Sequence, residues 1–208
     1  MKLFFTLVFT ALMLGSLRAQ TPAGETPTVV FFGDSLAAGY GLEDHVTMAF
    51  PGLIQKKIHD AQLPYLVVNA GLSGDTSAGG LRRINWILRQ RIDVFILELG
   101  GNDGLRGLPI ATTRSNLQAI IDLVRAKNPA VKVIVAGMQM PINMGSYGKE
   151  FAAIFPALAS ASGATLIPFL LKDVGGIPEL NLADGIHPTA EGHRRVAETV
   201  WPILRPLL

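Results

Sequence analysis

The amino-acid sequence predicts an α/β protein in which helices cover both faces of a parallel sheet within a single domain. Two observations lead to this prediction. Five short apolar runs, rich in β-branched residues, alternate with longer segments of helical period, and each run is continuously apolar. Strands buried on both faces need continuous apolarity, and alternation of strand with helix is typical of a parallel sheet joined by crossover helices.

The expected strands are Val29–Phe32, Leu66–Val68, Val94–Leu99, Val131–Gly137 and Thr165–Phe169. Three apolar stripes at helical spacing lie between them: Leu81, Ile84 and Leu88; Leu117, Ile120, Ile121 and Val124; and Phe151, Ile154, Phe155 and Leu158. Such spacing places side chains on one face of a helix. The first stripe follows an N-cap at Thr76 or Ser77, and Pro156 must kink or restart the third helix.

A last helix is expected after Thr189, whose hydroxyl can cap it. Its apolar side chains include Val196 and Val200, and Pro202 is expected to break it because proline lacks the N–H that a helix needs. No internal repeat, linker or low-complexity stretch interrupts the alternation. One domain over residues 28–208 is therefore expected.

The first nineteen residues have the pattern of a secretory signal peptide. Lys2 supplies a positive charge, Leu3–Leu14 carries none, and the small Ala19 precedes the expected cut, although a site a few residues later is open. The alternative is an uncleaved anchor, but a membrane span needs about 20 apolar residues. The sequence thus predicts an exported protein, periplasmic or secreted, with residues 20–27 as a flexible tail.

Charge and cysteine content exclude several classes of protein. The 208 residues include 18 basic and 16 acidic side chains and no cysteine. Cleavage after Ala19 removes Lys2 and Arg18 and no acid, so 16 basic and 16 acidic groups remain. A neutral mature chain gives no support to nucleic-acid binding. The lack of cysteine excludes disulfides, thiolate metal sites and a cysteine nucleophile.

Four polar or glycine-rich clusters follow the expected strands. They are Gly33-Asp34-Ser35-Leu36, Asn69-Ala70-Gly71-Leu72-Ser73-Gly74-Asp75-Thr76, Gly100-Gly101-Asn102-Asp103-Gly104 and, after the fifth strand, Ala183-Asp184-Gly185-Ile186-His187-Pro188. In an open parallel sheet the carboxyl ends of the strands share one edge, where ligands bind. We therefore expect these clusters to converge on one crevice.

The clusters contain the parts of a serine hydrolase. Ser35 lies at a strand-to-helix turn and needs a base to take its proton during attack. His187 can be that base, and Asp184 can hold its tautomer and stabilise the imidazolium. The N–H groups of Ser35 and Gly74 and the side-chain amide of Asn102 are candidate donors to the oxyanion of a tetrahedral intermediate.

Each of these residues has a simpler explanation as well. Ser35 can merely cap a helix, Gly74 can be a turn residue with positive φ, and Asn102 can be an amide that fixes a loop. Local structural roles are also expected for Asp34, Asp75 and Asp103. Glu98, a charge inside an apolar strand, must have a partner that the sequence does not name. The other histidines, which lack a partner pattern, are expected at surface or helix positions: His45, His59 and His193.

Apolar residues after the third and fourth strands are candidates for substrate contact. Leu105 and Leu108 follow Asn102, and Met140 and Ile142 follow the fourth strand. Methionine adapts its shape and suits a surface that accepts varied apolar groups. Ordinary core or loop packing is the equally weighted alternative.

Taken together, the four clusters resemble the blocks of the SGNH, or GDSL, hydrolases in order and spacing. The strings GDSLAAGYG, SGDTSAGGLRR, LELGGNDGLRGLP and DGIHP are similar to those of its thioesterase I, lysophospholipase and arylesterase branch, and the likeness covers about residues 28–205. The resemblance implies a flavodoxin-like three-layer α/β/α sandwich with a five-stranded parallel sheet in the order 2-1-3-4-5. It also implies Ser35 as nucleophile, the Asp184–His187 dyad, and an oxyanion hole of Ser35, Gly74 and Asn102.

The leading functional hypothesis is a monomeric serine hydrolase of carboxylic esters and thioesters that needs no cofactor or metal. Its expected substrates are aryl esters, short- to medium-chain acyl esters, lysophospholipids and acyl-thioesters. A carbohydrate O-acetyl esterase of the same fold and a non-catalytic binding domain are alternatives. A metal-dependent phosphoesterase is the remaining one, disfavoured by the lack of a second patterned histidine, and its hard ligands would be Asp34, Asn102, Asp103, Asp184 and His187.

Overall fold

A computed structural model describes residues 26–208, and at its centre lies one sheet in the order β2-β1-β3-β4-β5. Every neighbouring pair of strands is parallel. The strands are β1 (Thr28–Gly33), β2 (Leu66–Asn69), β3 (Val94–Glu98), β4 (Lys132–Ala136) and β5 (Thr165–Ile167). The predicted five-stranded parallel sheet and its order are confirmed. The expected signal peptide, and the expected tail up to residue 25, lie outside the described residues.

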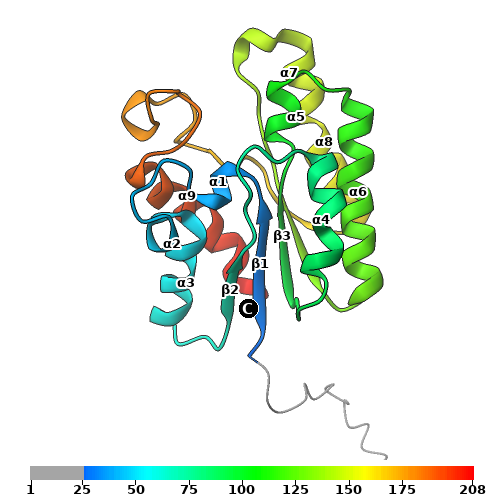
Figure 1. Ribbon diagram of the computed structural model, residues 1–208, viewed down its shortest axis with the longest axis vertical. Coiled ribbons are helices and arrows are strands. Elements are labelled where there is room, and N and C mark those ends of the chain that lie inside the picture. Colours follow the sequence, from blue (N-terminus) through cyan, green and yellow to red (C-terminus); the bar gives the residue numbers. More distant parts are fainter. Residues whose placement is uncertain (1–25) are drawn as a thin grey trace, which may run out of the picture.

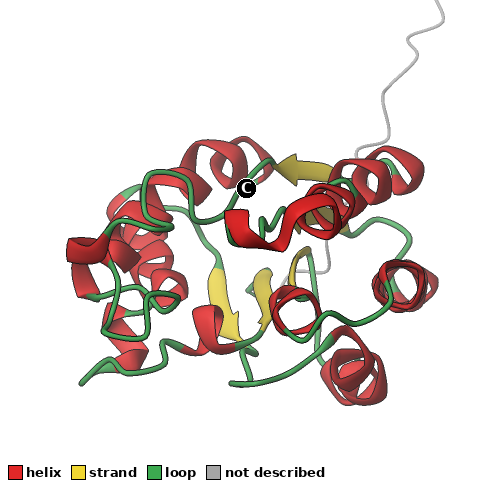
Figure 2. Cartoon of the chain, turned by 90° about the horizontal axis from the view of Figure 1, so that it is seen from above, coloured by secondary structure: helices red, strands yellow, loops and turns green. Residues whose placement is uncertain are grey.

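Helices cover both faces of this sheet, which confirms the predicted three layers (Figures 1 and 2). Helices α3 and α9 contact each other on one face, and α6 contacts both α4 and α8 on the other. The helices are α1 (Ser35–Ala38), α2 (His45–Met48), α3 (Phe50–Asp60), α4 (Ser77–Ile87), α5 (Gly101–Leu105), α6 (Ile110–Lys127), α7 (Gly145–Ala152), α8 (Ile154–Ser162) and α9 (Ala190–Leu204), with short 3₁₀ turns at η1 (Ile142–Met144), η2 (Pro178–Leu180) and η3 (Arg205–Leu207). Over residues 26–208, no helix combines the length and apolar character needed to cross a bilayer.

The two central strands carry the core, but the edge strands are less buried than continuous apolarity implied. In β1, residues 29–32 have no exposed surface, and all five residues of β3 are buried. In β2, by contrast, Leu66 is 53% exposed. The expectation of burial on both faces is wrong for β2, because it is an edge strand whose cover by α3 is incomplete. Sequence composition alone does not report a strand's place in the sheet.

Proline residues lie at the end of β5 and near the start of α8, but proline does not end α9. Strand β5 ends at Ile167 rather than Phe169, since Pro168 has no N–H to continue the ladder. The helix restarts as expected near Pro156, which lies in the first turn of α8. The break expected at Pro202 does not occur, and α9 continues to Leu204. Leu204 is fully buried, and such burial contributes about 1.5–3 kcal/mol against the helix penalty of roughly 3 kcal/mol for proline.

The topology determines where the functional loops meet. The chain leaves β1 toward β2 on one side and reaches β3 on the other side, so the strand order reverses at the β1–β3 pair. A crevice opens at such a point, just beyond the carboxyl ends of the strands. Helices α1 and α5 begin there, directly after β1 and β3, near the top of Figure 1.

One histidine lies in the core rather than at the surface. His193 is on α9, as expected for a helix position, but only 1% of it is exposed. Its Nδ1 accepts a hydrogen bond from the Phe50 N–H at 3.2 Å, and its imidazole ring stacks on the phenyl ring of Phe50. Its Nε2 has no hydrogen-bond partner among residues 26–208. Burial, together with the nearby His187, lowers the pKa of His193 to about 4.

This buried imidazole is expected to make the fold sensitive to mild acid. Unfolded histidine binds a proton below about pH 6.5, whereas His193 in the fold stays neutral down to about pH 4. Its contribution to stability is therefore lost as the pH falls from about 6.5 to about 4. Between pH 7 and pH 5 the loss should be about 2 kcal/mol in the free energy of unfolding.

Urea unfolding of wild type and His193→Asn at the two pH values measures this effect. Asparagine keeps an acceptor for the Phe50 N–H but does not titrate, so the variant should lose less stability on acidification. His59→Asn, at an exposed position, is the matched control and should behave as wild type. Equal pH dependence in wild type and His193→Asn would contradict the prediction.

Candidate active site

Ser35 is presented by a sharp turn between β1 and α1. Asp34 caps this four-residue helix, and its Oδ1 accepts a hydrogen bond from the Leu36 N–H at 3.1 Å. The helix ends at Gly39, which adopts a left-handed φ of 75° that favours glycine. The turn is so short that Ser35, at the first helical position, lies beside the crevice while 9% of its surface remains exposed.

Ser35, His187 and Asp184 form one continuous hydrogen-bonded chain. His187 Nε2 lies 2.9 Å from Ser35 Oγ, and His187 Nδ1 lies 2.7 Å from Asp184 Oδ2. The other oxygen, Asp184 Oδ1, accepts the N–H groups of Ile186 and His187, both at 3.0 Å. The carboxylate therefore orients the ring and the backbone that carries it. The ring of Tyr40 packs against His187, with 4.5 Å between centroids.

The electrostatics of this chain favour an ionised Asp184. Partial burial opposes ionisation, but the hydrogen bonds from the Ile186 N–H and from the side chain and backbone of His187 outweigh it and lower the pKa of Asp184 to about 2. An ionised Asp184 accepts only, so Nδ1 of His187 must carry a proton and Nε2 of the neutral ring is left free to accept one. The geometry thus selects the tautomer that a general base needs.

Two backbone N–H groups of the expected oxyanion hole have no hydrogen-bond partner within residues 26–208. One belongs to Ser35 and the other to Gly74, which has a left-handed φ of 78°. The loop of Gly74 is held by Arg106, whose Nη2 donates to the Gly74 carbonyl at 3.1 Å. Free donors at this edge of the sheet are what an oxyanion would require.

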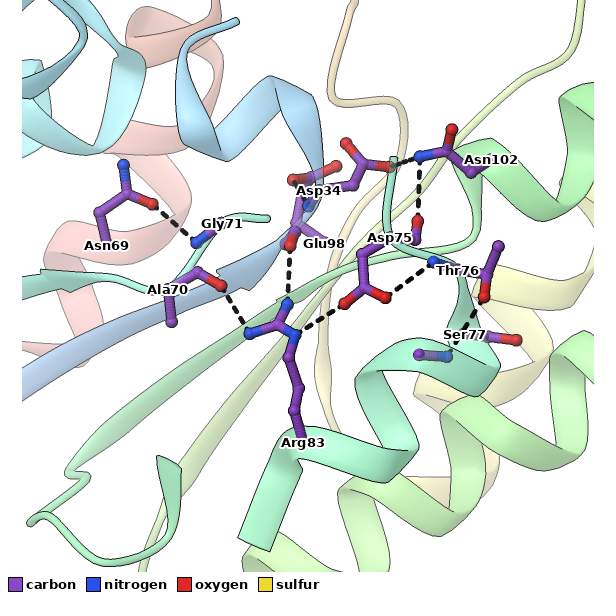
Figure 3. Close-up of polar contacts among 12 residues, drawn as sticks. Asp34, Asn69, Ala70, Gly71, Asp75, Thr76, Ser77, Arg83, Glu98 and Asn102 are labelled. Carbon is purple, nitrogen blue, oxygen red and sulfur yellow. Dashed lines mark hydrogen bonds and ion pairs between the residues drawn. The ribbon is translucent and has the colours of Figure 1, made fainter. Parts of the chain in front are cut away.

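The third expected donor, Asn102, is already engaged. Its Nδ2 donates to Asp34 Oδ2 at 3.1 Å and to the Asp75 carbonyl at 2.9 Å, as Figure 3 shows. Both hydrogens of the amide are therefore used, and an oxyanion would have to share one of them. Burial raises the pKa of Asp34 to about 6, although the Leu36 N–H and the Asn102 amide oppose this.

A mostly apolar cavity of about 420 Å³ opens beside Ser35 and His187. Of the expected substrate-contacting residues, Leu105, Met140 and Ile142 line it. Leu108 does not: Gly107, with φ of 63°, turns the chain, and the Leu108 carbonyl accepts from the Tyr147 hydroxyl at 2.8 Å. Apolar lining residues that the sequence analysis missed are Leu36, Phe169, Leu171 and Ile186.

The remaining acidic residues near the crevice hold its loops together. Asp103 accepts from the N–H and hydroxyl of Ser77 at the start of α4, and from the hydroxyl of Thr113. Asp75 accepts from the Thr76 N–H and forms an ion pair with Arg83. The local structural roles expected for them match these contacts. Since Asp103 faces α4 rather than Ser35, it does not join the other hard ligands suggested for a metal-dependent phosphoesterase.

Comparison with known proteins identifies relatives of this chain. The GDSL-like Lipase/Acylhydrolase family matches residues 31–195. Esterase TesA of Pseudomonas aeruginosa is 41% identical over 92% of this chain and 94% of its own, and thioesterase 1/protease 1/lysophospholipase L1 of Escherichia coli is 36% identical over 97% and 93%. A crystal structure of TesA superposes with a TM-score of 0.83 at 41% identity, covering 87% of this chain and 99% of that one.

A second solved structure, a psychrotrophic esterase EstA from Pseudoalteromonas, has a TM-score of 0.80 at 30% identity and covers 86% of this chain and 97% of its own. This esterase structure is described as inhibited by monoethylphosphonate. The family match spans most of the chain, and the relatives match it nearly end to end. The chain therefore belongs to the GDSL-like lipase/acylhydrolase family.

Proposed function

We propose that this acylhydrolase is a serine esterase that cleaves carboxylic esters and thioesters with apolar acyl groups through an acyl-enzyme on Ser35. The observation that carries the proposal is the hydrogen-bonded chain Ser35–His187–Asp184 at the mouth of an apolar cavity. A hydroxyl, a base and an orienting carboxylate in this order are what nucleophilic acyl transfer requires.

In the first half of the reaction, Ser35 Oγ attacks the ester carbonyl carbon while its proton passes to His187 Nε2. The imidazolium that forms is stabilised by Asp184, 2.7 Å away. His187 then gives this proton to the leaving alcohol or thiol, and the acyl group stays on Ser35 as an ester. In the second half, His187 Nε2 takes a proton from water as the water oxygen attacks the acyl carbon. The bond from the acyl carbon to Ser35 Oγ then breaks, His187 returns the proton to Ser35, and the acid departs.

Negative charge develops on the carbonyl oxygen in both tetrahedral intermediates. We assign its stabilisation to the unpartnered N–H groups of Ser35 and Gly74 and to one hydrogen of the Asn102 amide. The first two donors need no rearrangement. The third must weaken its bond to Asp34, so its contribution is expected only once the oxyanion has formed. Such a donor acts on the transition state rather than on the bound substrate.

The cavity supports a preference for apolar acyl or aryl groups. Leu105 ends α5 after β3, Met140 and Ile142 follow β4, and Phe169 and Leu171 follow β5. Methionine can adjust to chains of different length. The names of the relatives, which include esterase, lysophospholipase and arylesterase, are in keeping with a range of acyl and aryl substrates.

A hydrolysis profile tests the substrate class. We expect turnover of p-nitrophenyl esters and of the matching thioesters from butyryl upward, and of lysophospholipids, because burial of each CH₂ contributes about 0.8 kcal/mol. Activity should be unaffected by EDTA. A profile confined to acetate release from acetylated glycans would contradict the apolar-acyl proposal, and loss of activity in EDTA with recovery on adding a divalent metal would contradict the serine mechanism.

We further propose that the chain is exported and acts outside the cytoplasm. The support is the basic, apolar and small-residue pattern of positions 1–19, which is typical of a cleaved leader. Mass spectrometry of the exported protein should find an N-terminus at Gln20 or a few residues later. A protein retained in the cytoplasm at full length would contradict export.

A further inference from the structure

Glu98 is a carboxyl group placed in the core directly beneath the Ser35 turn. It is the last residue of β3, pairs in register with Gly33 of β1, and has no exposed surface. Its Oε2 accepts the N–H of Asp34 at 3.1 Å (Figure 3). It also accepts the N–H of Ala37 at 3.3 Å. A side chain from one central strand thus holds the backbone on both sides of the serine that follows the neighbouring strand.

The N–H groups of the turn show what Glu98 does there. Five consecutive N–H groups run from residue 34 to residue 38. Glu98 takes those of Asp34 and Ala37, the Asp34 side chain takes that of Leu36, and the Asp34 carbonyl takes that of Ala38. Only the Ser35 N–H has no partner within residues 26–208. The acceptors around the turn therefore leave one donor, the one beside the nucleophile, without a partner.

Gly33 gives independent support that Glu98 is packed closely against this turn. A Cβ atom at position 33 would lie 2.1 Å from Glu98 Oε2 and 2.8 Å from the Ala37 Cβ. Such distances are far inside van der Waals contact, so a residue with a side chain would displace the carboxyl group or the turn. The close approach of the Glu98 carboxyl group thus explains why the first motif begins with glycine at position 33.

The charges around Glu98 determine its protonation. Burial first, and then the neighbouring Asp34 carboxyl, raise its pKa well above the ordinary value, while Arg83 and the two N–H donors oppose this. Arg83 is itself bound to Asp75 and to the carbonyls of Ala70 and Gly33. The raised pKa favours the protonated form of Glu98, while both oxygens of Asp34 accept hydrogen bonds. A neutral carboxyl still accepts through its carbonyl oxygen, which an uncharged amide can imitate.

We propose that Glu98 is a positioning residue for the reaction: it acts through the N–H groups of Asp34 and Ala37 to hold Ser35 Oγ toward His187 and to keep the Ser35 N–H free for the oxyanion. The inference rests on the proposed serine mechanism. It assigns to Glu98 a role in kcat that is separate from its place in the core.

Three substitutions at position 98 separate the two roles. Glu98→Leu fills the space but accepts nothing, and Glu98→Asp shortens the reach by one methylene. Both should lower kcat by about 10²-fold with little change in KM, since a displacement of about 1 Å can cost that much. Glu98→Gln retains the acceptor and should keep most of the wild-type kcat. The rate at which a fluorophosphonate labels Ser35 should fall in Glu98→Leu and Glu98→Asp and should stay close to that of wild type in Glu98→Gln.

The controls keep each outcome decisive. Ile96→Val shortens a buried side chain two residues earlier on the same strand and should leave kcat unchanged in the folded protein. If Glu98→Leu does not fold, Glu98→Asp and Glu98→Gln carry the comparison, with rates normalised to folded protein by circular dichroism. Wild-type kcat in both Glu98→Leu and Glu98→Asp, or loss of kcat in Glu98→Gln equal to that in Glu98→Asp, would overturn the inference. Wild-type activity in Ser35→Ala, assayed in parallel, would instead refute the serine mechanism on which it rests.

Discussion

Ser35→Ala is expected to lower kcat for p-nitrophenyl butyrate by about 10⁴-fold or more while leaving the fold intact, because removal of a nucleophile abolishes the covalent route. The substitution removes only one oxygen, and alanine is compatible with the short helix α1. Residual hydrolysis would come from oxyanion stabilisation and binding alone. KM should change little, because Ser35 Oγ is hydrogen-bonded to His187, whereas the acyl group is bound by the apolar cavity.

Labelling of the protein distinguishes an active serine from an inert one. A fluorophosphonate should form one adduct per wild-type chain, located on Ser35 by mass spectrometry, and none on Ser35→Ala. Ser77, which is fully buried and bonded to Asp103, provides the matched control, because Ser77→Ala should keep the adduct. Wild-type hydrolysis by Ser35→Ala would refute the assignment, and an unlabelled, inactive wild type would point to a non-catalytic binding domain.

Asp184→Asn is expected to have the second largest effect, lowering kcat by about 10³- to 10⁴-fold. Asparagine Oδ1 can still accept the N–H groups of Ile186 and His187, so the loop should keep its shape. Its amide nitrogen then faces His187 Nδ1 and donates to it. The ring proton moves to Nε2, which can no longer accept the proton of Ser35.

Kinetics and NMR together test this argument. The imidazole nitrogen shifts of His187 should report a proton on Nδ1 in wild type and on Nε2 in Asp184→Asn. Asp173→Asn, an exposed carboxylate close in sequence, should leave both kcat and the tautomer unchanged. A wild-type kcat in Asp184→Asn would show that the carboxylate is dispensable.

Much of the fold was predictable because strands and motifs are local. A continuously apolar run identifies a strand without reference to the rest of the chain, and the order of the sheet followed from the family resemblance. Helix α3 was missed, although the fully buried Phe50, Ile54 and Ile58 repeat every four residues and a period test over that window could have found it. The exposure of Leu66 could not be read from the sequence, because it depends on which strand lies at the edge.

The site was predictable where a residue's chemistry alone suggested its role. Ser35, His187 and Asp184 were expected to meet, and the structure brings them within hydrogen-bonding distance. Residues that act through position were missed. Phe169 lines the cavity just after the end of β5, and Glu98 finds its partners in the turn that follows the neighbouring strand β1. Such contacts depend on the three-dimensional register, which a linear pattern does not contain.

The reacting pair joins the two ends of the domain. Ser35 follows the first strand, whereas His187 precedes the last helix, and 152 positions separate them along the chain. A polypeptide still emerging from the ribosome therefore contains the nucleophile long before it contains the base. On the proposed mechanism, hydrolysis begins only after nearly the whole chain has been synthesised. Truncated chains that lack the last fifth of the sequence, and with it His187, should therefore be inactive.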